Sequence, residues 1–238
     1  MLLLSVVVLV AGCKKSSTTE PVTKANIIGT VYLYDDGTNL LPGDGMIVNI
    51  DGSSPLISAV TGADGSFVLA DVPFGTYTLS FSKTGYGTFK RLALVHSDMG
   101  GSTIVNPSPS LGQYSTTTIT GLTSVPSTNM ATLSITTLPA PTSQVPRYVR
   151  VFFSKSAAVS FYSYLKYTIV YKQMSNPANL DLHIKTLNEM GFSSGDTVYA
   201  RAYGDSFWSN DYDNLLSGKR EFPDLNSTTV PAVSFVVP

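Results

Sequence analysis

Side chains that commonly carry enzyme chemistry are scarce in this sequence. It holds one cysteine, Cys13, and two histidines, His96 and His183, which stand far apart in the chain. No serine-nucleophile elbow, zinc-binding helix motif or phosphate-cradling glycine loop is present. The 16 Asp and Glu residues could in pairs serve glycoside hydrolysis, but most stand beside Gly or Asn in expected turns. We therefore predict a protein that is not an enzyme and uses no metal ion or other cofactor. A hydrolase with an unfamiliar site is the catalytic alternative.

A group of large aromatic residues stands in a polar segment near the C-terminus. Phe207, Trp208 and Tyr212 are interspersed with aspartate, asparagine and serine residues. Aromatic rings in such a loop cost solvation free energy unless something covers them. Planar rings that stack on sugar faces, beside carboxylates and amides that bond hydroxyl groups, would form a glycan site. We predict that these three side chains bind a ligand. The alternative is that Trp208 folds back and caps the open end of its own domain.

The run that precedes this segment alternates with a period of two, which is typical of a strand. This register buries Val198 and Ala200 and directs Tyr199, Arg201 and Tyr203 to the opposite face. We predict that these three outward side chains extend the ligand surface. Cross-strand tyrosine pairs are the alternative.

The same stretch is rich in oxygen-bearing side chains, which could hold a calcium ion. They are Asp205, Asn210, Asp211, Asp213 and Asn214. Their spacing is not that of a known calcium-binding loop, so we expect solvated turn residues and no metal site.

The overall composition favours strands and turns over helices. Charged residues make up only 13% of the chain, which contains 19 Gly and 14 Pro. The net charge of −1 provides no electrostatic footprint for nucleic acid. We predict an all-β protein with two antiparallel β-sandwich domains in tandem. A single cysteine excludes disulfides within the chain, so each domain must be stabilised by hydrophobic burial.

The first predicted domain covers residues 26–112. Apolar residues alternate in the runs 27–33, 46–50 and 76–82, as they do in strands with one buried face. Asp64-Gly65 stands between two apolar runs and is typical of a tight hairpin turn. Stacked antiparallel strands are the expected outcome.

Five motifs in this region resemble the carboxypeptidase regulatory-like domain, a small transthyretin-like sandwich. They are Gly29-Thr30-Val31, Pro42-Gly43, residues 61–67, residues 72–79 and Gly85-Tyr86. The resemblance implies an accessory module that is attached to enzymes, transporters and surface lipoproteins without being catalytic. Glycines at turns and alternating apolar residues explain every motif structurally.

The second predicted domain covers residues 113–238 and follows an expected Pro-rich linker at residues 106–110. About six short strands are expected, and a single helical turn near residues 186–190 should end at Gly191. The segment 195–204 resembles the sixth strand of a fibronectin type III or immunoglobulin-like sandwich. The resemblance implies a second antiparallel sandwich.

The N-terminus combines a short apolar run with the only cysteine. Residues 2–11 are too few to span a bilayer but fit the core of a secretory signal. Val10-Ala11-Gly12-Cys13 resembles a bacterial lipobox, and the start of the mature chain is similar to lipoproteins of the Bacteroides group. The resemblance implies a signal peptide at 1–12, a lipidated Cys13, and a tether over 13–25. A buried N-terminal strand with an inert cysteine is the alternative.

Together these features predict a non-enzymatic, lipid-anchored protein of the cell envelope. It would be attached to the outer membrane, on its periplasmic face or at the cell surface, and would act as a structural, interaction or adhesion module. The alternative is a carbohydrate-binding accessory lipoprotein of a glycan-uptake system. The expected partners are the membrane, through the lipid anchor, and a glycan or an envelope protein, but not nucleic acid.

Overall fold

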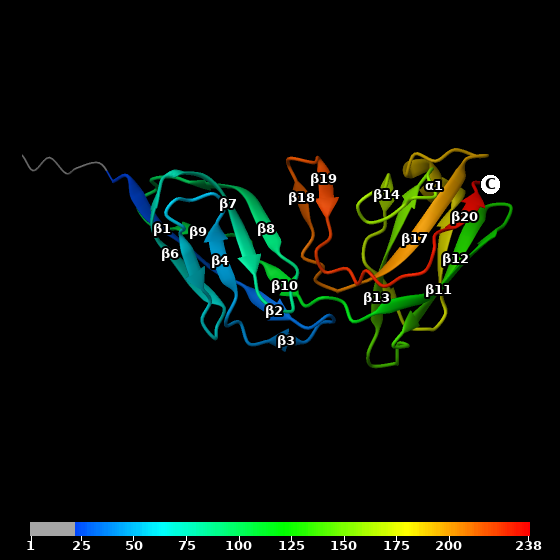
Figure 1. The fold of residues 1–238 in the computed structure, drawn as a ribbon, viewed down its shortest axis with the longest axis horizontal. Coiled ribbons are helices and arrows are strands. Elements are labelled where there is room, and N and C mark those ends of the chain that lie inside the picture. Colours follow the sequence, from blue (N-terminus) through cyan, green and yellow to red (C-terminus); the bar gives the residue numbers. More distant parts are fainter. Residues whose placement is uncertain (1–21) are drawn as a thin grey trace, which may run out of the picture.

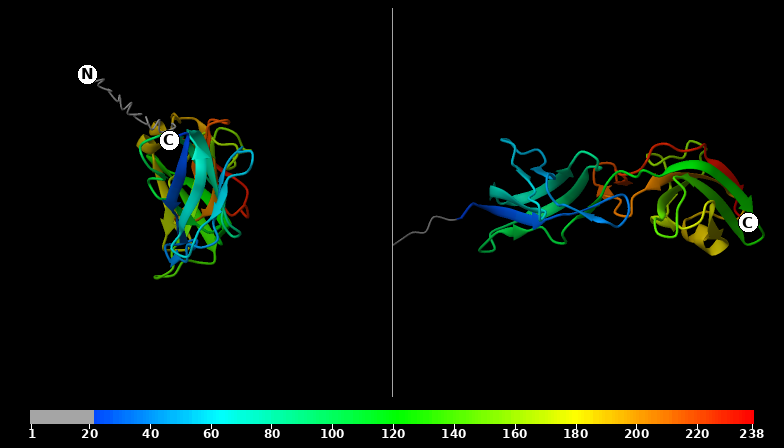
Figure 2. Two further views of the ribbon diagram at one scale, coloured as in Figure 1. Left: turned by 90° about the vertical axis from the view of Figure 1, so that its left-hand side faces the viewer. Right: turned by 90° about the horizontal axis from the view of Figure 1, so that it is seen from below.

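The computed structural model describes residues 22–238, so the predicted signal peptide and Cys13 lie outside the described residues. Two strand-rich bodies lie end to end along the long axis of the molecule (Figure 1). Viewed along that axis, one body covers the other (Figure 2). Almost all strand pairs are antiparallel and the described part contains one short helix. The predicted all-β class with antiparallel sandwiches is therefore confirmed.

The first body is built from three small sheets around one apolar core. Their strands, in sheet order, are β6 (Ser66–Pro73), β1 (Lys24–Thr30) and β9 (Thr103–Ile104); β10 (Ser110–Gly112), β2 (Tyr32–Tyr34) and β3 (Leu40–Leu41); and β5 (Ser58–Val60), β4 (Ile47–Ile50), β7 (Gly75–Ser82) and β8 (Phe89–His96). The predicted alternation in β7 holds, because Leu79 and Phe81 are fully buried. Strand β8 forms one edge of the last sheet.

The second body is a sandwich of two sheets. The first sheet contains β11 (Thr118–Pro126), β12 (Met130–Leu138) and β16 (Ala178–His183); the second contains β14 (Lys166–Tyr167), β13 (Arg147–Ser154), β17 (Thr197–Asp205) and β20 (Val233–Val236), with β15 (Tyr171–Gln173) also paired to β13. The helix α1 (Ile184–Glu189) follows β16, and Gly191 beyond it has a φ of +85°. Val198, Ala200 and Ala202 are fully buried in the core, as their alternation predicts.

The predicted linker at residues 106–110 is wrong. Ser110 begins β10, which pairs in parallel with β2 inside the first body. Pro107 and Pro109 interrupt backbone hydrogen bonding only locally, so a strand forms as soon as they are passed.

A hairpin of β18 (Tyr212–Asn214) and β19 (Lys219–Glu221) projects from the second body and stands between the two bodies (Figure 1). It brings residues far along the chain next to β8. Over residues 22–238, no helix has the length and apolarity that a membrane crossing requires.

Candidate functional site

Part of the aromatic segment is docked on the first body. Residues 206–210, here called the docked segment, exchange backbone hydrogen bonds with it. The Phe207 N–H donates to the Asp36 carbonyl at 3.1 Å, and the Gly112 N–H donates to the Trp208 carbonyl at 3.0 Å. The buried Asn210 side chain both donates to the Gly112 carbonyl and accepts from its N–H, each at 2.9 Å. These bonds fix the two bodies to each other.

Two glycines of the first body make this docking possible. A Cβ on Gly112 would collide with the Trp208 carbonyl oxygen, and one on Gly87 would collide with Pro223 and Asp224. The Gly87 N–H instead donates to Asp224 Oδ1 at 2.7 Å. The backbones therefore approach more closely than any other residue type would allow.

The rings of the docked segment also pack on protein. Trp208 lies 5.0 Å from the Tyr34 ring of the first body, measured between ring centroids. Phe207 lies 5.4 Å from Tyr148, edge to face. The predicted alternative had Trp208 covering its own domain, whereas the ring covers the neighbouring one. Phe207 remains partly exposed and, with Trp208, borders a hollow of about 260 Å³.

A buried arginine bonds to the docked segment and to the residues on either side of it. Arg150 on β13 donates from Nε to Asp205 at 2.7 Å and from Nη2 to Ser209 at 3.0 Å. It also forms an ion pair with Asp211 at 3.2 Å, and its guanidinium lies 4.6 Å from the Phe222 ring centroid. Arg150 is only 3% exposed. The sequence reasoning missed this residue, although a lone arginine inside the apolar run 148–153 was the available signal.

Two buried carboxyl groups titrate abnormally near this contact. Burial raises the pKa of Asp205 to about 6, although Arg150 opposes the shift. Burial raises the pKa of Asp224 to about 9, and the charges of Asp205 and Asp211 add to the effect. Asp224 therefore holds its proton at neutral pH. Nothing in the sequence pattern marked it.

The carboxylates of the acidic cluster pair with arginines. Asp205 pairs with Arg150, while Asp211 and Asp213 each lie 3.0 Å from Arg220. The expectation of a solvated turn is wrong for Asp205, which is the last residue of β17 and is buried beside Arg150. In residues 22–238 no three or more His, Cys, Asp or Glu side chains are grouped as metal ligands.

The outer face of β17 is largely covered. Tyr203 is 3% exposed and packs edge to face on Phe161 at 5.1 Å and Phe152 at 5.7 Å. Its predicted exposure is wrong, because the segment that follows β13 folds over this face as a second apolar cluster. Tyr199 packs at the margin of that cluster, and Arg201 is half-buried beside them.

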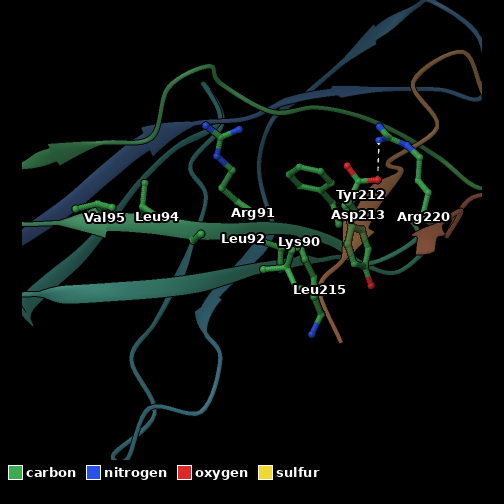
Figure 3. A pocket seen from close by; sticks show the side chains of 11 residues that line it. Lys90, Arg91, Leu92, Leu94, Val95, Tyr212, Asp213, Leu215 and Arg220 are labelled. Atoms are coloured by element: carbon green, nitrogen blue, oxygen red, sulfur yellow. Dashed lines mark hydrogen bonds and ion pairs between the residues drawn. The ribbon is translucent and has the colours of Figure 1, made fainter. Parts of the chain in front are cut away.

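A groove lies between the free edge of β8 and the hairpin (Figure 3). Its volume is about 510 Å³, and it is lined by all of residues 89–95 together with Tyr212, Asp213, Leu215 and Arg220. Tyr212 belongs to the predicted ligand-binding set, whereas the β8 residues were not predicted. Neither body could form this groove alone.

The groove combines aromatic, cationic and apolar groups. Tyr212 meets Phe89 edge to face, with ring centroids 6.4 Å apart. Burial raises the pKa of the Tyr212 hydroxyl above its ordinary value. Lys90 pairs with Asp51 at 2.8 Å, and the Arg91 guanidinium donates to the Asn106 carbonyl at 2.8 Å. Such a surface can bind a ligand through ring faces and hydrogen bonds.

The two histidines lie elsewhere. His96 is buried, with Nδ1 2.7 Å from Thr103 Oγ1 and Nε2 3.0 Å from the Val72 carbonyl. His183 is exposed at the end of β16.

Comparisons with known proteins show a distant likeness to solved structures from Bacteroides and its relatives. A DUF3823 family protein from Parabacteroides merdae shares 15% identity and a TM-score of 0.32, covering 90% of this chain and 100% of that one. A "putative carbohydrate binding protein" from Bacteroides uniformis shares 13% identity and a TM-score of 0.32, covering 89% and 98%. A DUF3823 family protein from Bacteroides ovatus shares 12% identity and a TM-score of 0.33, covering 90% and 100%. At TM-scores of this size no property of these proteins is transferred to this chain. No family model matches the chain, and no curated protein does either.

Proposed function

We propose that this protein is a non-enzymatic carbohydrate-binding protein of the cell envelope, and that the groove between β8 and the β18–β19 hairpin receives the glycan. The observation that carries the proposal is the meeting of Tyr212 and Phe89 in a groove that both bodies build. Planar aromatic faces suit the apolar faces of sugar rings. The charged and backbone groups around them suit the hydroxyl groups.

The docking of the two bodies supports this role. A ligand that touches both β8 and the hairpin is bound well only when their relative position is fixed beforehand, because ordering them on binding would cost free energy. The hydrogen bonds between Gly112 and the docked segment supply that fixed geometry. In this proposal the first body, which resembles a regulatory-like domain in sequence, serves as spacer and as one wall of the groove.

A binding experiment tests the glycan proposal. The mature protein is applied to an array of plant and bacterial polysaccharides, beside Tyr212→Ala and a control, Tyr32→Ala. Tyr32 is 45% exposed on β2 and does not line the groove. We expect binding by the parent and the control and a loss for Tyr212→Ala. Equal binding by all three would rule out the groove, and hydrolysis of the bound glycan would contradict a non-enzymatic role.

A protein-interaction module is the second candidate. The tip of the hairpin presents Leu215 and Leu216, which are 71% and 99% exposed. Exposed neighbouring leucines are typical of surfaces that another protein covers. An array without glycan binding, together with capture of an envelope protein that fails for Leu216→Ser, would favour this candidate.

The envelope location is proposed from the lipobox resemblance around Cys13. Stable anchoring requires more than one acyl chain, and the lipidated cysteine of bacterial lipoproteins provides them. Labelling of growing cells with a palmitate analogue should mark the parent protein and spare Cys13→Ala. Equal labelling of both would refute the anchor.

A further inference from the structure

The groove contains one cation whose bonding capacity is largely unused. Three cations line it: Lys90, Arg91 and Arg220. Lys90 pairs with Asp51, and Arg220 pairs with Asp211 and Asp213. Among residues 22–238, Arg91 has no carboxylate partner; its one hydrogen bond is to the backbone carbonyl of Asn106. We propose that Arg91 binds the carboxylate of an acidic sugar, so that the groove selects glycans containing uronic acids. This inference rests on the proposed function.

The position of Arg91 in the sheet is unusual for a charged residue. Across the β7–β8 ladder it stands opposite Leu79, while Phe89 stands opposite Phe81. Directly opposed residues share one face of a sheet, so Arg91 occupies the face that carries the core. Of the other β8 residues on this face, Phe89 and Leu94 are apolar, and His96 is buried with both ring nitrogens hydrogen-bonded. Arg91 differs from all three, because most of its donors have no partner in the described part of the chain.

The backbone around Arg91 directs the side chain toward the groove. A bulge follows Arg91, and Ala93 within it has a φ of +53°, which is rare for a residue other than glycine. Bulges bend an edge strand and re-aim its side chains, often beside functional sites. In Figure 3 Arg91 and Arg220 point to the same side of β8, whereas Lys90 points away from them.

The free donors of Arg91 match a carboxylate. A guanidinium carries five N–H donors in a planar fork, and the bond to Asn106 uses only one nitrogen, Nη2. That bond holds the side chain in place, while the remaining donors can form the paired bonds that a carboxylate accepts. Phe89 lies two residues away on the same face, and Tyr212 contacts it. A sugar ring against these aromatics would bring a carboxylate on that ring toward Arg91.

Among the described residues that line the groove, Arg91 is the one cation left for an anionic ligand, because Lys90 and Arg220 already pair with carboxylates. Sulfate esters could also approach its guanidinium, but they lack the planar pair of oxygens. The two sources of negative charge can be separated by experiment.

The test compares three polymers on the full mature protein by affinity electrophoresis and calorimetry: polygalacturonate, the same polymer with its carboxylates methyl-esterified, and dextran sulfate. We expect binding to polygalacturonate, and at least about tenfold weaker binding to the ester and to dextran sulfate, because the charge-assisted paired bonds are lost. Arg91→Gln should reduce polygalacturonate binding by about tenfold and leave binding of the ester unchanged. Lys90→Gln, which removes an equal charge, should have a much smaller effect.

Each other outcome overturns one statement. Equal binding of polygalacturonate and its ester, unaffected by Arg91→Gln, would overturn the acidic-sugar inference and leave the groove as a glycan site. Tight binding of dextran sulfate, or equal losses for Arg91→Gln and Lys90→Gln, would show general charge attraction in place of carboxylate recognition. If neither pectic polymer binds but the array shows another glycan dependent on Tyr212, the inference fails alone. If no glycan binds at all, the proposed function fails with it. Unchanged thermal unfolding of Arg91→Gln confirms that the variant is folded.

Discussion

The docked segment and the β18–β19 hairpin are neighbours in sequence and similar in composition, yet their surroundings differ. Both combine aromatic and polar residues: the docked segment holds Phe207 and Trp208, and the hairpin holds Tyr212. In the docked segment Ser206 and Asn210 are buried between the two bodies. In the hairpin Leu216 is almost fully exposed, and Tyr212 borders open grooves.

The difference arises from backbone partners. The docked segment meets Gly112, which lacks a Cβ and leaves its N–H and carbonyl free for Trp208 and Asn210. The hairpin pairs only with itself, through β18 and β19, and leans toward the edge of β8. Aromatic residues in a polar segment therefore do not by themselves indicate a ligand surface. Of the two segments, the one whose backbone forms hydrogen bonds with the first body becomes an internal contact.

The largest expected effect comes from removing the charge behind the docked segment. Arg150→Ala leaves Asp205 buried without its cation, and breaking a buried ion pair costs about 3–5 kcal/mol of unfolding free energy. Without Arg150 the pKa of Asp205 should rise above its present value of about 6. The variant should therefore lose less stability at pH 5 than at pH 8, because the carboxyl then takes up a proton. Urea unfolding at both pH values measures this.

The matched control is the exposed pair of Lys24 and Asp71, whose atoms lie 3.1 Å apart. Lys24→Ala should change the unfolding free energy by less than about 1 kcal/mol. A similar cost for Arg150→Ala would mean that the buried pair contributes no more than a surface one.

The second prediction undoes the docking itself. Gly112→Ala introduces a methyl group against the Trp208 carbonyl, and overpacking of this kind costs about 1–3 kcal/mol. The bodies should separate, and the radius of gyration from small-angle scattering should increase. Gly101→Ala is the control, because its Cβ would meet nothing within 4 Å. Unchanged scattering for Gly112→Ala would show that the docking tolerates the added methyl group. Glycan binding should fall with the docking.

The third prediction concerns the pH dependence of the same contact. Asp224 keeps its proton up to a pKa of about 9 in the folded state, whereas the unfolded chain releases it near its ordinary pKa of 3.8. The unfolded state therefore binds fewer protons between these values. As the pH rises through this range, the unfolding free energy of the parent should fall relative to that of Asp224→Asn, by up to about 1.4 kcal/mol per pH unit.

Asp224→Asn retains an oxygen that can accept the Gly87 N–H, which makes it a suitable reference. Urea unfolding of both proteins from pH 5 to pH 8 gives the difference directly. A difference that stays constant over this range would show that Asp224 is already ionised in the folded protein.

The sequence predicted regular elements well and contacts between distant segments poorly. Alternation identified the buried faces of β7 and β17 because each strand has one face on a core, so Leu79 and Val198 were placed correctly. It gave Tyr203 as exposed, because a period of two cannot show that a second layer covers the outer face. Arg150, Asp224 and Gly112 escaped notice for a similar reason. Each acts through residues far away in the chain, and no local pattern encodes such a pairing.

The smallest expected effect lies at the tip of the hairpin. Leu216 is 99% exposed, so Leu216→Ser removes no contact from the folded protein and should change the unfolding free energy by less than about 0.5 kcal/mol. The matched change in the docked segment is Phe207→Ser. Because the Phe207 ring packs on Tyr148, this change should lower the unfolding free energy distinctly more. Thermal unfolding of the two variants at a concentration series compares them. A cost for Leu216→Ser that grows with protein concentration would mean that a second copy covers the tip. The contrast between a closed and an open aromatic segment would then hold only for the isolated chain.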